Sequence, residues 1–453
     1  MNHVLTEQDY KNFQPILEHP DVPAITNPWK KRTVAQILRN TKEELVAEHY
    51  ARGGRMLVEN PIPVNLMGAS SSTASDGAID IFDPILINLI RRAMPNLISY
   101  DIMGVQPMTG PTGLIFALRS RYTNQSGTET FYNEVNTAFS TVAGNANTLG
   151  DKHVGTLPGN TTQTINLAST GLYNYADAMS TAQAEALGTD SNTDFAQMAF
   201  SIEKVTVTAG SRALAAEYTM ELAQDLKAVH GLDAESELSN ILSTEILAEI
   251  NREALRTILV TASRGSTTDT TTAGIFDMDV DSNGRWMAEK FKGLAFHITR
   301  EANQIARDTR RGRGNILICT SDVAAALEAA GKLSVPVGST DAQGLEYDDT
   351  GNTFAGMMGR MKVYIDPYAS GGNYFVVGYK GPNPYDAGIF YCPYVPLQML
   401  RAVWPGSMTP RLGFKTRYGM VANPFAQGTT AGAGALVKDS NVYYRRSLIT
   451  NLM

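Results

Sequence analysis

The spacing of apolar residues predicts a long helical region near the middle of the chain. Residues 213–230 (ALAAEYTMELAQDLKAVH) are rich in strong helix formers and precede Gly231, a residue suited to the left-handed position after a helix. Asp233 is suited to start a second helix that continues to about Ala262. If nearly collinear, the two helices would form a rod of about 70 Å, with Gly231 as a candidate hinge in this spine. The predicted apolar side of the second helix carries Leu238, Leu242, Ile246 and Ile250 at four-residue spacing, with Ile241, Leu255 and Ile258 beside them.

Shorter periodic segments predict further helices on both sides of this region. Thr33 is a candidate cap for an N-terminal helix, and another short helix is expected from about Pro84 to Met94. A third runs from about Arg285 to Arg307, and a fourth starts at Ser321 as its cap and closes at Gly331. The apolar side of the N-terminal helix would carry Val34, Ile37, Leu38, Leu45 and Val46, and that of the third Met287, Phe291, Leu294, Ile298, Ala302 and Ile305.

Strands and loops complete the predicted pattern. Residues 60–77 (NPIPVNLMGASSSTASDG) have the composition of a linker. Residues 110–200 are rich in Thr, Asn, Gly and Ser with weak alternation, which predicts an extended β-hairpin-like loop that reaches beyond the subunit. Helices that alternate with short apolar runs favour a mixed α/β fold. Those runs are Ile316–Cys319, Val363–Ile365, Tyr374–Val377 and Ile389–Tyr391.

Composition narrows the class of protein. The chain has 453 residues, of which 43% are apolar and 18% charged, a balance typical of folded proteins rather than of disordered or membrane-spanning chains. The net charge of −7 argues against a protein that grips nucleic acid, although an acidic wall can still enclose DNA. The first residues lack the pattern of a secretory signal, so folding in the cytosol is expected. Cys319 and Cys392 lie 73 positions apart and are expected to be buried free thiols.

Two polar segments could hold ligands, but each has a simpler interpretation. From Asp279 onwards the sequence supplies oxygens at positions 1, 3 and 5 of a calcium loop and a glycine at position 6, yet the twelfth position is Lys290. A polar loop before a helix is therefore favoured over a metal site. The segment from Arg307 to Gly314 could cradle a phosphate, but a helix-ending turn is favoured, because cations oppose the negative pole of a helix C-terminus. The acidic segment contains Asp277, Asp279, Asp281, Asn283 and Gly284. The arginine-rich segment contains Arg307, Arg310, Arg311, Gly312, Arg313 and Gly314.

No enzyme signature is evident among the remaining residues. None of the six histidines lies in a GxSxG or HExxH frame, and His297 is expected to be a packed core or interface residue. His230 is expected to cap a helix before Gly231. The aromatic and proline-rich segment 377–397 favours packing at a domain edge or subunit contact over ligand stacking. We therefore expect no catalytic residue, no cofactor and no metal.

Four long blocks of the sequence closely resemble the T4-like major capsid proteins of tailed bacteriophages. They are residues 101–122 (DIMGVQPMTGPTGLIFALRSRY), 216–253, 377–397 and 413–426 (GFKTRYGMVANPFA). The resemblance implies an HK97-like shell fold, with an N-terminal arm, an extended β loop, a peripheral domain that contains the long spine helix, and an axial domain. The expected boundaries are 1–77 for the arm and linker, 78–109 for a connection, 110–200 for the loop, 201–300 for the peripheral domain, 301–410 for the axial domain and 411–453 for the return and C-terminal segment.

The resemblance also implies function and partners. The chain would assemble as hexamers into the icosahedral or prolate head of a contractile-tailed phage and enclose double-stranded DNA without binding it specifically. Its partners would be copies of itself, a vertex protein, a portal, a scaffold and decoration proteins, with no membrane. It would be made and assembled in the host cytoplasm and located in the virion. The alternatives are the paralogous pentameric vertex subunit, a cellular nanocompartment shell protein and, from the enzyme class, a hydrolase or calcium-binding protein.

A processing site is a further implication of the resemblance. Members of the family are trimmed by a phage protease after a hydrophobic-x-Glu sequence, and Leu57-Val58-Glu59 fits that pattern at the boundary between leader and linker. Leu57 and Glu59 are therefore candidate recognition residues. Retention of the leader for structural work is the alternative.

Overall fold

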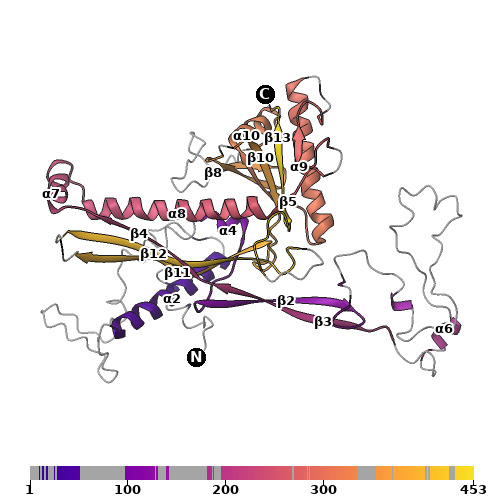
Figure 1. Ribbon diagram of the computed structural model, residues 1–453, viewed down its shortest axis with the longest axis horizontal. Helices are drawn as coiled ribbons and strands as arrows, with labels where there is room; N and C mark the ends of the chain where they lie inside the picture. The colour runs from indigo at the N-terminus through magenta and orange to yellow at the C-terminus, as the bar shows by residue number, and fades with distance from the viewer. Residues whose placement is uncertain are drawn as a thin grey trace.

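The computed structural model shows an elongated molecule with projecting parts (Figure 1). The longest helix lies beside a four-stranded sheet. A two-stranded hairpin extends away from this sheet, and a second sheet with helices of its own lies at the C-terminal end of the longest helix. Among the described residues, no helix is long and apolar enough to cross a membrane. The described residues are 10, 13–14, 17–18, 25, 28–51, 97–127, 129–130, 139–141, 181–185, 187, 195–267, 270–282, 284, 286–334, 353–369, 371–403, 406, 409–427 and 434–452.

The N-terminal arm contains helix α2, Pro28–Ala51. Proline is well suited to the first helical position, because it lacks the N–H group that would be unpaired there. The prediction that Thr33 caps this helix is wrong, since Thr33 lies inside it and its hydroxyl donates to the Trp29 carbonyl at 3.1 Å. The predicted apolar side is confirmed at Val34, Ile37 and Leu38, which are buried in the main core. The helix expected from Pro84 to Met94 lies outside the described residues.

A four-stranded sheet with the order β1-β11-β12-β4 lies beside the long helix. Its strands are β1 (Gly104–Val105), β11 (Ile389–Val403), β12 (Pro410–Ala422) and β4 (Gly210–Glu217), and the short helix α4 (Ser99–Ile102) precedes β1. The predicted helix over 213–230 is wrong in its first part, because residues 213–217 belong to β4 and pair antiparallel with β12. Strand pairing with a distant segment overrides the local helix propensity of these residues.

The helical prediction holds from Met220 onwards. Helix α7, Met220–Val229, begins after Thr219, whose hydroxyl accepts a hydrogen bond from the Leu222 N–H at 3.3 Å, and His230 caps its end. Gly231 has a φ of +68°, a left-handed conformation that ends the helical backbone after α7. Helix α7 therefore does not continue into helix α8, Ala234–Thr261. The predicted rod of about 70 Å is therefore wrong, and the 28 residues of α8 alone extend about 42 Å. Ile241 was predicted beside the buried stripe but is 63% exposed. The stripe itself is confirmed at Leu242, Ile246, Ile250, Leu255 and Ile258.

The second sheet has the order β5-β13-β10-β7-β9-β8, and β6 also pairs with β13. Its strands are β5 (Ala262–Arg264), β6 (Ile275–Asp277), β7 (Ile316–Thr320), β8 (Thr353–Met358), β9 (Met361–Asp366), β10 (Asn373–Gly378) and β13 (Asn441–Thr450). Helices α9 (Met287–Thr309) and α10 (Ser321–Ala329) pack on it. The N-cap of α10 is Thr320 rather than the predicted Ser321, because the strand runs one residue further, and Gly331 closes the helix with a φ of +67°.

The extended loop begins and ends as an antiparallel hairpin of β2 (Thr112–Tyr122) and β3 (Met198–Thr208), and the 3₁₀ helix η2 (Phe139–Thr141) and helix α6 (Thr181–Glu185) lie between them in sequence. One main core joins α2, α8, α9 and the second sheet, and a smaller apolar cluster holds the base of the hairpin. Cys319 and Cys392 are buried free thiols, as predicted. The mixed α/β fold with an arm, an extended hairpin, a long helix and a separate sheet matches the HK97-like architecture that the resemblance implied.

Candidate assembly interface

The β2–β3 hairpin presents a row of large apolar side chains to solvent. The two strands pair in continuous register from Thr112 opposite Thr208 to Tyr122 opposite Met198. Because side chains alternate across a strand, residues with even numbers on both strands share one face. We call the apolar members of this face the hairpin strip, and they are exposed by 55% to 68%: Leu114, Phe116, Leu118, Met198, Phe200 and Ile202.

The opposite face of the hairpin is anchored to the body of the same chain. Ile115, Val205 and Val207 are buried against the body, in a cluster with Phe390 and Val421 of the four-stranded sheet. The base is therefore fixed by apolar packing, while the hairpin strip faces outward. A two-stranded ribbon with one exposed apolar face is marginally stable by itself in water, so the strip is suited to burial against another surface.

Arg119 fixes the base of the hairpin through charge. Its guanidinium is fully buried and lies 3.0 Å from a Glu129 carboxylate oxygen and 3.3 Å from a Glu203 carboxylate oxygen. It also donates to the Pro424 carbonyl at 2.5 Å and stacks 4.7 Å from the centre of the Phe425 ring. Burial, partly offset by Arg119, raises the pKa of Glu129. These contacts connect the hairpin to a turn about 300 residues away in sequence.

We expect Arg119→Met to destabilise the folded chain by about 3–5 kcal/mol, because it leaves Glu129 without its buried cation and Glu203 with only Arg121. Arg121→Met is a matched control, since Arg121 also pairs with Glu203 but its side chain is 19% exposed. The control should cost about 1 kcal/mol or less. Urea unfolding of the soluble chain measures both, and equal losses would show that Arg119 has no special role.

A second exposed apolar surface lies on α7. Helix α7 has no buried residue, and Met220, Leu222 and Val229 are exposed by 57%, 51% and 74%. An isolated helix of ten residues is marginal in water, so packing against another surface would stabilise it. In Figure 1, α7 lies at the left end of the molecule, whereas the hairpin extends to the right from its centre, so the two exposed apolar surfaces are far apart.

Comparison with known proteins shows which family has this architecture. Residues 79–449 match the family described as major capsid protein Gp23. The chain belongs to that family. The major capsid protein of Serratia phage KSP90 is 42% identical over 401 residues, covering 85% of this chain and 88% of that protein. That of Enterobacteria phage T4 is 36% identical over 515 residues, covering 97% of this chain and 98% of that protein.

Membership of the Gp23 family confirms the resemblance drawn from sequence and assigns the chain to the shell-forming major capsid proteins. The capsid vertex protein of Enterobacteria phage T4 is a more distant relative, 28% identical over 267 residues that cover 55% of this chain and 58% of that protein. Similarity to the major capsid proteins extends along most of the chain, whereas similarity to the vertex protein covers about half of it. The vertex subunit is therefore the weaker alternative.

The other residues singled out from the sequence fall in separate places. Gly231 lies between α7 and α8, and an added Cβ there would meet nothing within 4 Å. Leu57 and Glu59 lie outside the described residues. Arg310 adopts a left-handed conformation with a φ of 56° at the end of α9, and Arg311 pairs with Asp386 at 3.5 Å. The arginine-rich segment is thus a helix-ending turn, as favoured.

The acidic segment forms a hydrogen-bonded turn. Asp277 accepts from the Asp279 N–H at 2.9 Å and from the Asn451 amide at 2.9 Å, and these bonds lower its pKa. Asp279 pairs with Lys290 at 2.5 Å. Asp281 accepts from the Thr271 N–H at 2.9 Å and the Asp277 N–H at 3.0 Å. Neighbouring protein groups thus bind the carboxylates that a calcium loop would leave for the ion, in agreement with the favoured interpretation.

His297 is a core residue with a hydroxyl partner. Its Nε2 lies 2.7 Å from the Ser266 Oγ, and its ring stacks on Phe276 at 4.4 Å. Burial lowers the pKa of His297, with partial opposition from the Glu301 carboxylate. The serine and histidine together resemble a nucleophile and base, but Ser266 is 0% exposed, so solvent-borne substrate cannot reach its hydroxyl. The pair therefore serves as an internal hydrogen bond.

Sequence reasoning missed the two features that carry the interface. The alternation of Leu114, Phe116 and Leu118 was a detectable signal, but it is short within a region rich in polar residues. Arg119 gave no signal, because its partners Glu129, Glu203 and Pro424 come together only in the folded chain.

Proposed function

We propose that the chain builds the closed head of a contractile-tailed phage as hexamers, with the hairpin strip of each copy packed on a neighbouring copy. The observation that carries this proposal is a hairpin that is anchored on one face and apolar and exposed on the other. Covering its six large side chains would contribute on the order of 5–10 kcal/mol per copy before the cost of association. Summed over many copies, such contacts make a shell that resists internal pressure.

The charge and architecture of the chain suit a container. A net charge of −7 favours enclosing double-stranded DNA over binding it specifically along the wall. We assign α8 and the four-stranded sheet to the peripheral domain, and the second sheet with α9 and α10 to the axial domain around the sixfold axis. This assignment differs from the predicted boundaries, because it places α9, which starts at residue 287, in the axial domain and β11, which starts at residue 389, in the peripheral domain. In this proposal the chain acts mechanically, without catalysis or cofactor. Its further partners are a vertex protein, a portal, a scaffold and decoration proteins, with assembly in the host cytoplasm and residence in the virion.

Electron microscopy of particles that contain the chain, with its copy number per particle, tests this function. Closed shells in which the chain is the most abundant protein are expected. A few copies restricted to vertices would favour the pentameric subunit, and a shell around an enzyme cargo would favour a nanocompartment.

We propose that the leader is removed after Glu59. Mass spectrometry of the chain from mature particles should then find an N-terminus at Asn60, and Glu59→Gln should leave the chain at full length. A full-length chain in mature wild-type particles would show that the leader is retained.

Gly231 is proposed as a hinge between α7 and the spine helix α8 when the shell changes from a compact to an expanded form, in place of the hinge within a continuous rod that the sequence predicted. Its φ of +68° disfavours any residue with a Cβ, so Gly231→Ala should cost about 1 kcal/mol and slow the expansion of assembled shells. Gly110→Ala is a suitable control, because Gly110 has no positive φ and an added Cβ would have only an ordinary contact at 3.7 Å. Light scattering or microscopy over time measures expansion, and equal rates in the two variants would remove Gly231 from this role.

A further inference from the structure

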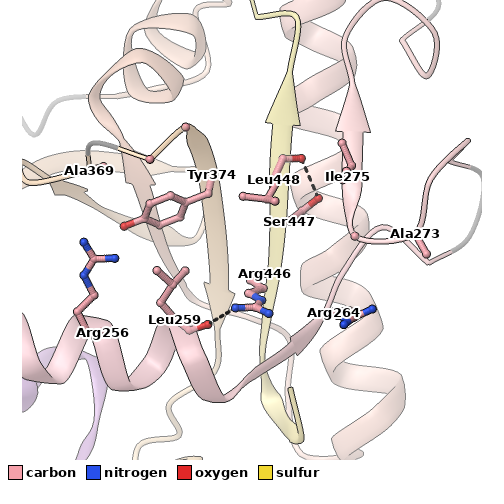
Figure 2. Close-up of a pocket in the computed structure, with 13 residues that line it drawn as sticks. Arg256, Leu259, Arg264, Ala273, Ile275, Ala369, Tyr374, Arg446, Ser447 and Leu448 are labelled. Carbon is pink, nitrogen blue, oxygen red and sulfur yellow. Dashed lines mark hydrogen bonds between the residues drawn. The ribbon is translucent and has the colours of Figure 1, made fainter. Parts of the chain in front are cut away.

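A cavity of about 420 Å³ lies where α8 ends against the second sheet. Its walls come from the last turns of α8, from β5 and β6, from the start of β10 and from β13 (Figure 2). Gly274 and Gly372 have φ values of +89° and +114°, and an added Cβ at either would meet nothing within 4 Å. Backbone without side chains therefore forms part of the rim, and the entrance is open there.

Positive charge exceeds negative charge around this cavity. Arg256, Arg264 and Arg446 line it. Asp439 compensates two of them, since it pairs with Arg446 and lies 3.5 Å from Arg264. Arg256 makes no hydrogen bond or ion pair with any residue that the structure describes. Two carboxylates in the same region already have other partners, since Asp366 pairs with Arg252 at 2.5 Å and Glu301 with Arg445 at 2.6 Å. Three guanidinium groups thus line the cavity, with Asp439 as the one carboxylate paired to them among the described residues.

The arginines are distributed along the cavity. Figure 2 shows Arg256 beside Tyr374 on one side, Arg264 on the other side and Arg446 between them. Arg446 is held in place, because one of its nitrogens donates to the Leu259 carbonyl at 2.9 Å. Arg264 is 66% exposed and able to turn toward a ligand. Such a row suits an extended ligand with several negative charges better than a single small anion.

We propose that this cavity binds a chain of phosphoryl groups. Guanidinium groups match phosphate oxygens in geometry and charge, and they retain their charge at every physiological pH. Tyr374 is 8% exposed and its hydroxyl donates to the Asp366 carboxylate, so the arginines are the groups left to recognise the phosphates. A nucleic-acid backbone and free polyphosphate share this chemistry. The site is a property of the folded chain and does not depend on assembly.

Calorimetric titration of the unassembled full-length chain at low ionic strength tests the proposal. Tripolyphosphate should bind at least about tenfold more tightly than orthophosphate, and added salt should weaken it. The double variant Arg256→Gln, Arg264→Gln should lose about tenfold or more in affinity for tripolyphosphate, because two charge-assisted contacts are removed. Arg360→Gln, at the exposed turn between β8 and β9, removes one charge elsewhere and should change affinity by less than about twofold.

A second titration with a single-stranded oligonucleotide of mixed sequence distinguishes the sources. Binding that competes with tripolyphosphate and is lost in the double variant would assign the site to a nucleic-acid backbone, and binding of tripolyphosphate alone would assign it to free polyphosphate. No binding of tripolyphosphate at millimolar concentration would overturn the proposal. Wild-type affinity in a double variant with unchanged circular dichroism would overturn it as well.

Discussion

Leu118→Asp combined with Phe200→Asp should leave a folded, soluble chain that forms no closed particles. Leu118 and Phe200 are 68% and 63% exposed and lie on the same face of the hairpin, where Phe200 is two residues from Ile202, the partner of Leu118. Aspartate at either site remains hydrated in the free chain, so folding should change little. In an assembled shell both carboxylates would be buried against a neighbouring copy, and each unpaired charge would cost several kcal/mol.

Thr208→Asp is the matched control for this double variant. Thr208 is exposed at the end of β3 and lies beyond the hairpin strip. The control should assemble as the wild type does, as measured by sedimentation and electron microscopy of the particles. Closed particles of normal size from the double variant would show that the strip is not an intersubunit surface.

Ile246→Asp should abolish folding of the chain. Ile246 is 1% exposed on the buried stripe of α8 and belongs to the main core. The substitution removes a large apolar side chain and buries a carboxylate without a partner, at a combined cost of more than about 5 kcal/mol. That exceeds much of the stability of a typical domain.

Ile241→Asp on the same helix is the matched control, because Ile241 is 63% exposed. It should alter unfolding by less than about 1 kcal/mol. Circular dichroism and solubility separate the two variants. A soluble, cooperatively unfolding Ile246→Asp chain would show that this face of α8 is not part of the core.

Helices that follow apolar periodicity were predictable from the sequence. The stripes on α8 and α9 are long and regular, so Ile246 and Ile298 could be placed in the core before the fold was known. For residues 213–217 the same reasoning gave a wrong prediction. Their alanine-rich sequence favours a helix, but they form a strand that pairs with β12, about 200 residues away in sequence. Local propensity is worth a few tenths of a kcal/mol per residue, and tertiary pairing outweighs it.

Boundaries and polar contacts were harder to predict. Thr33 is a good capping residue by type, but the helix starts at Pro28, five residues before it. The excess positive charge of the cavity could not be predicted from the sequence. Arg256, Arg264 and Arg446 are separated by up to 190 positions and come together only through the packing of α8 on β13. Features that depend on contacts between distant segments could not have been found from one sequence.

The most direct test of the account is the accessibility of Leu118→Cys to a thiol reagent before and after assembly. Burial raises the pKa of Cys319 and Cys392 to about 12, so these native thiols should not react. The introduced cysteine should be labelled rapidly in the unassembled chain and strongly protected in closed particles. Equal labelling in both states would contradict the claim that the hairpin strip is buried between copies.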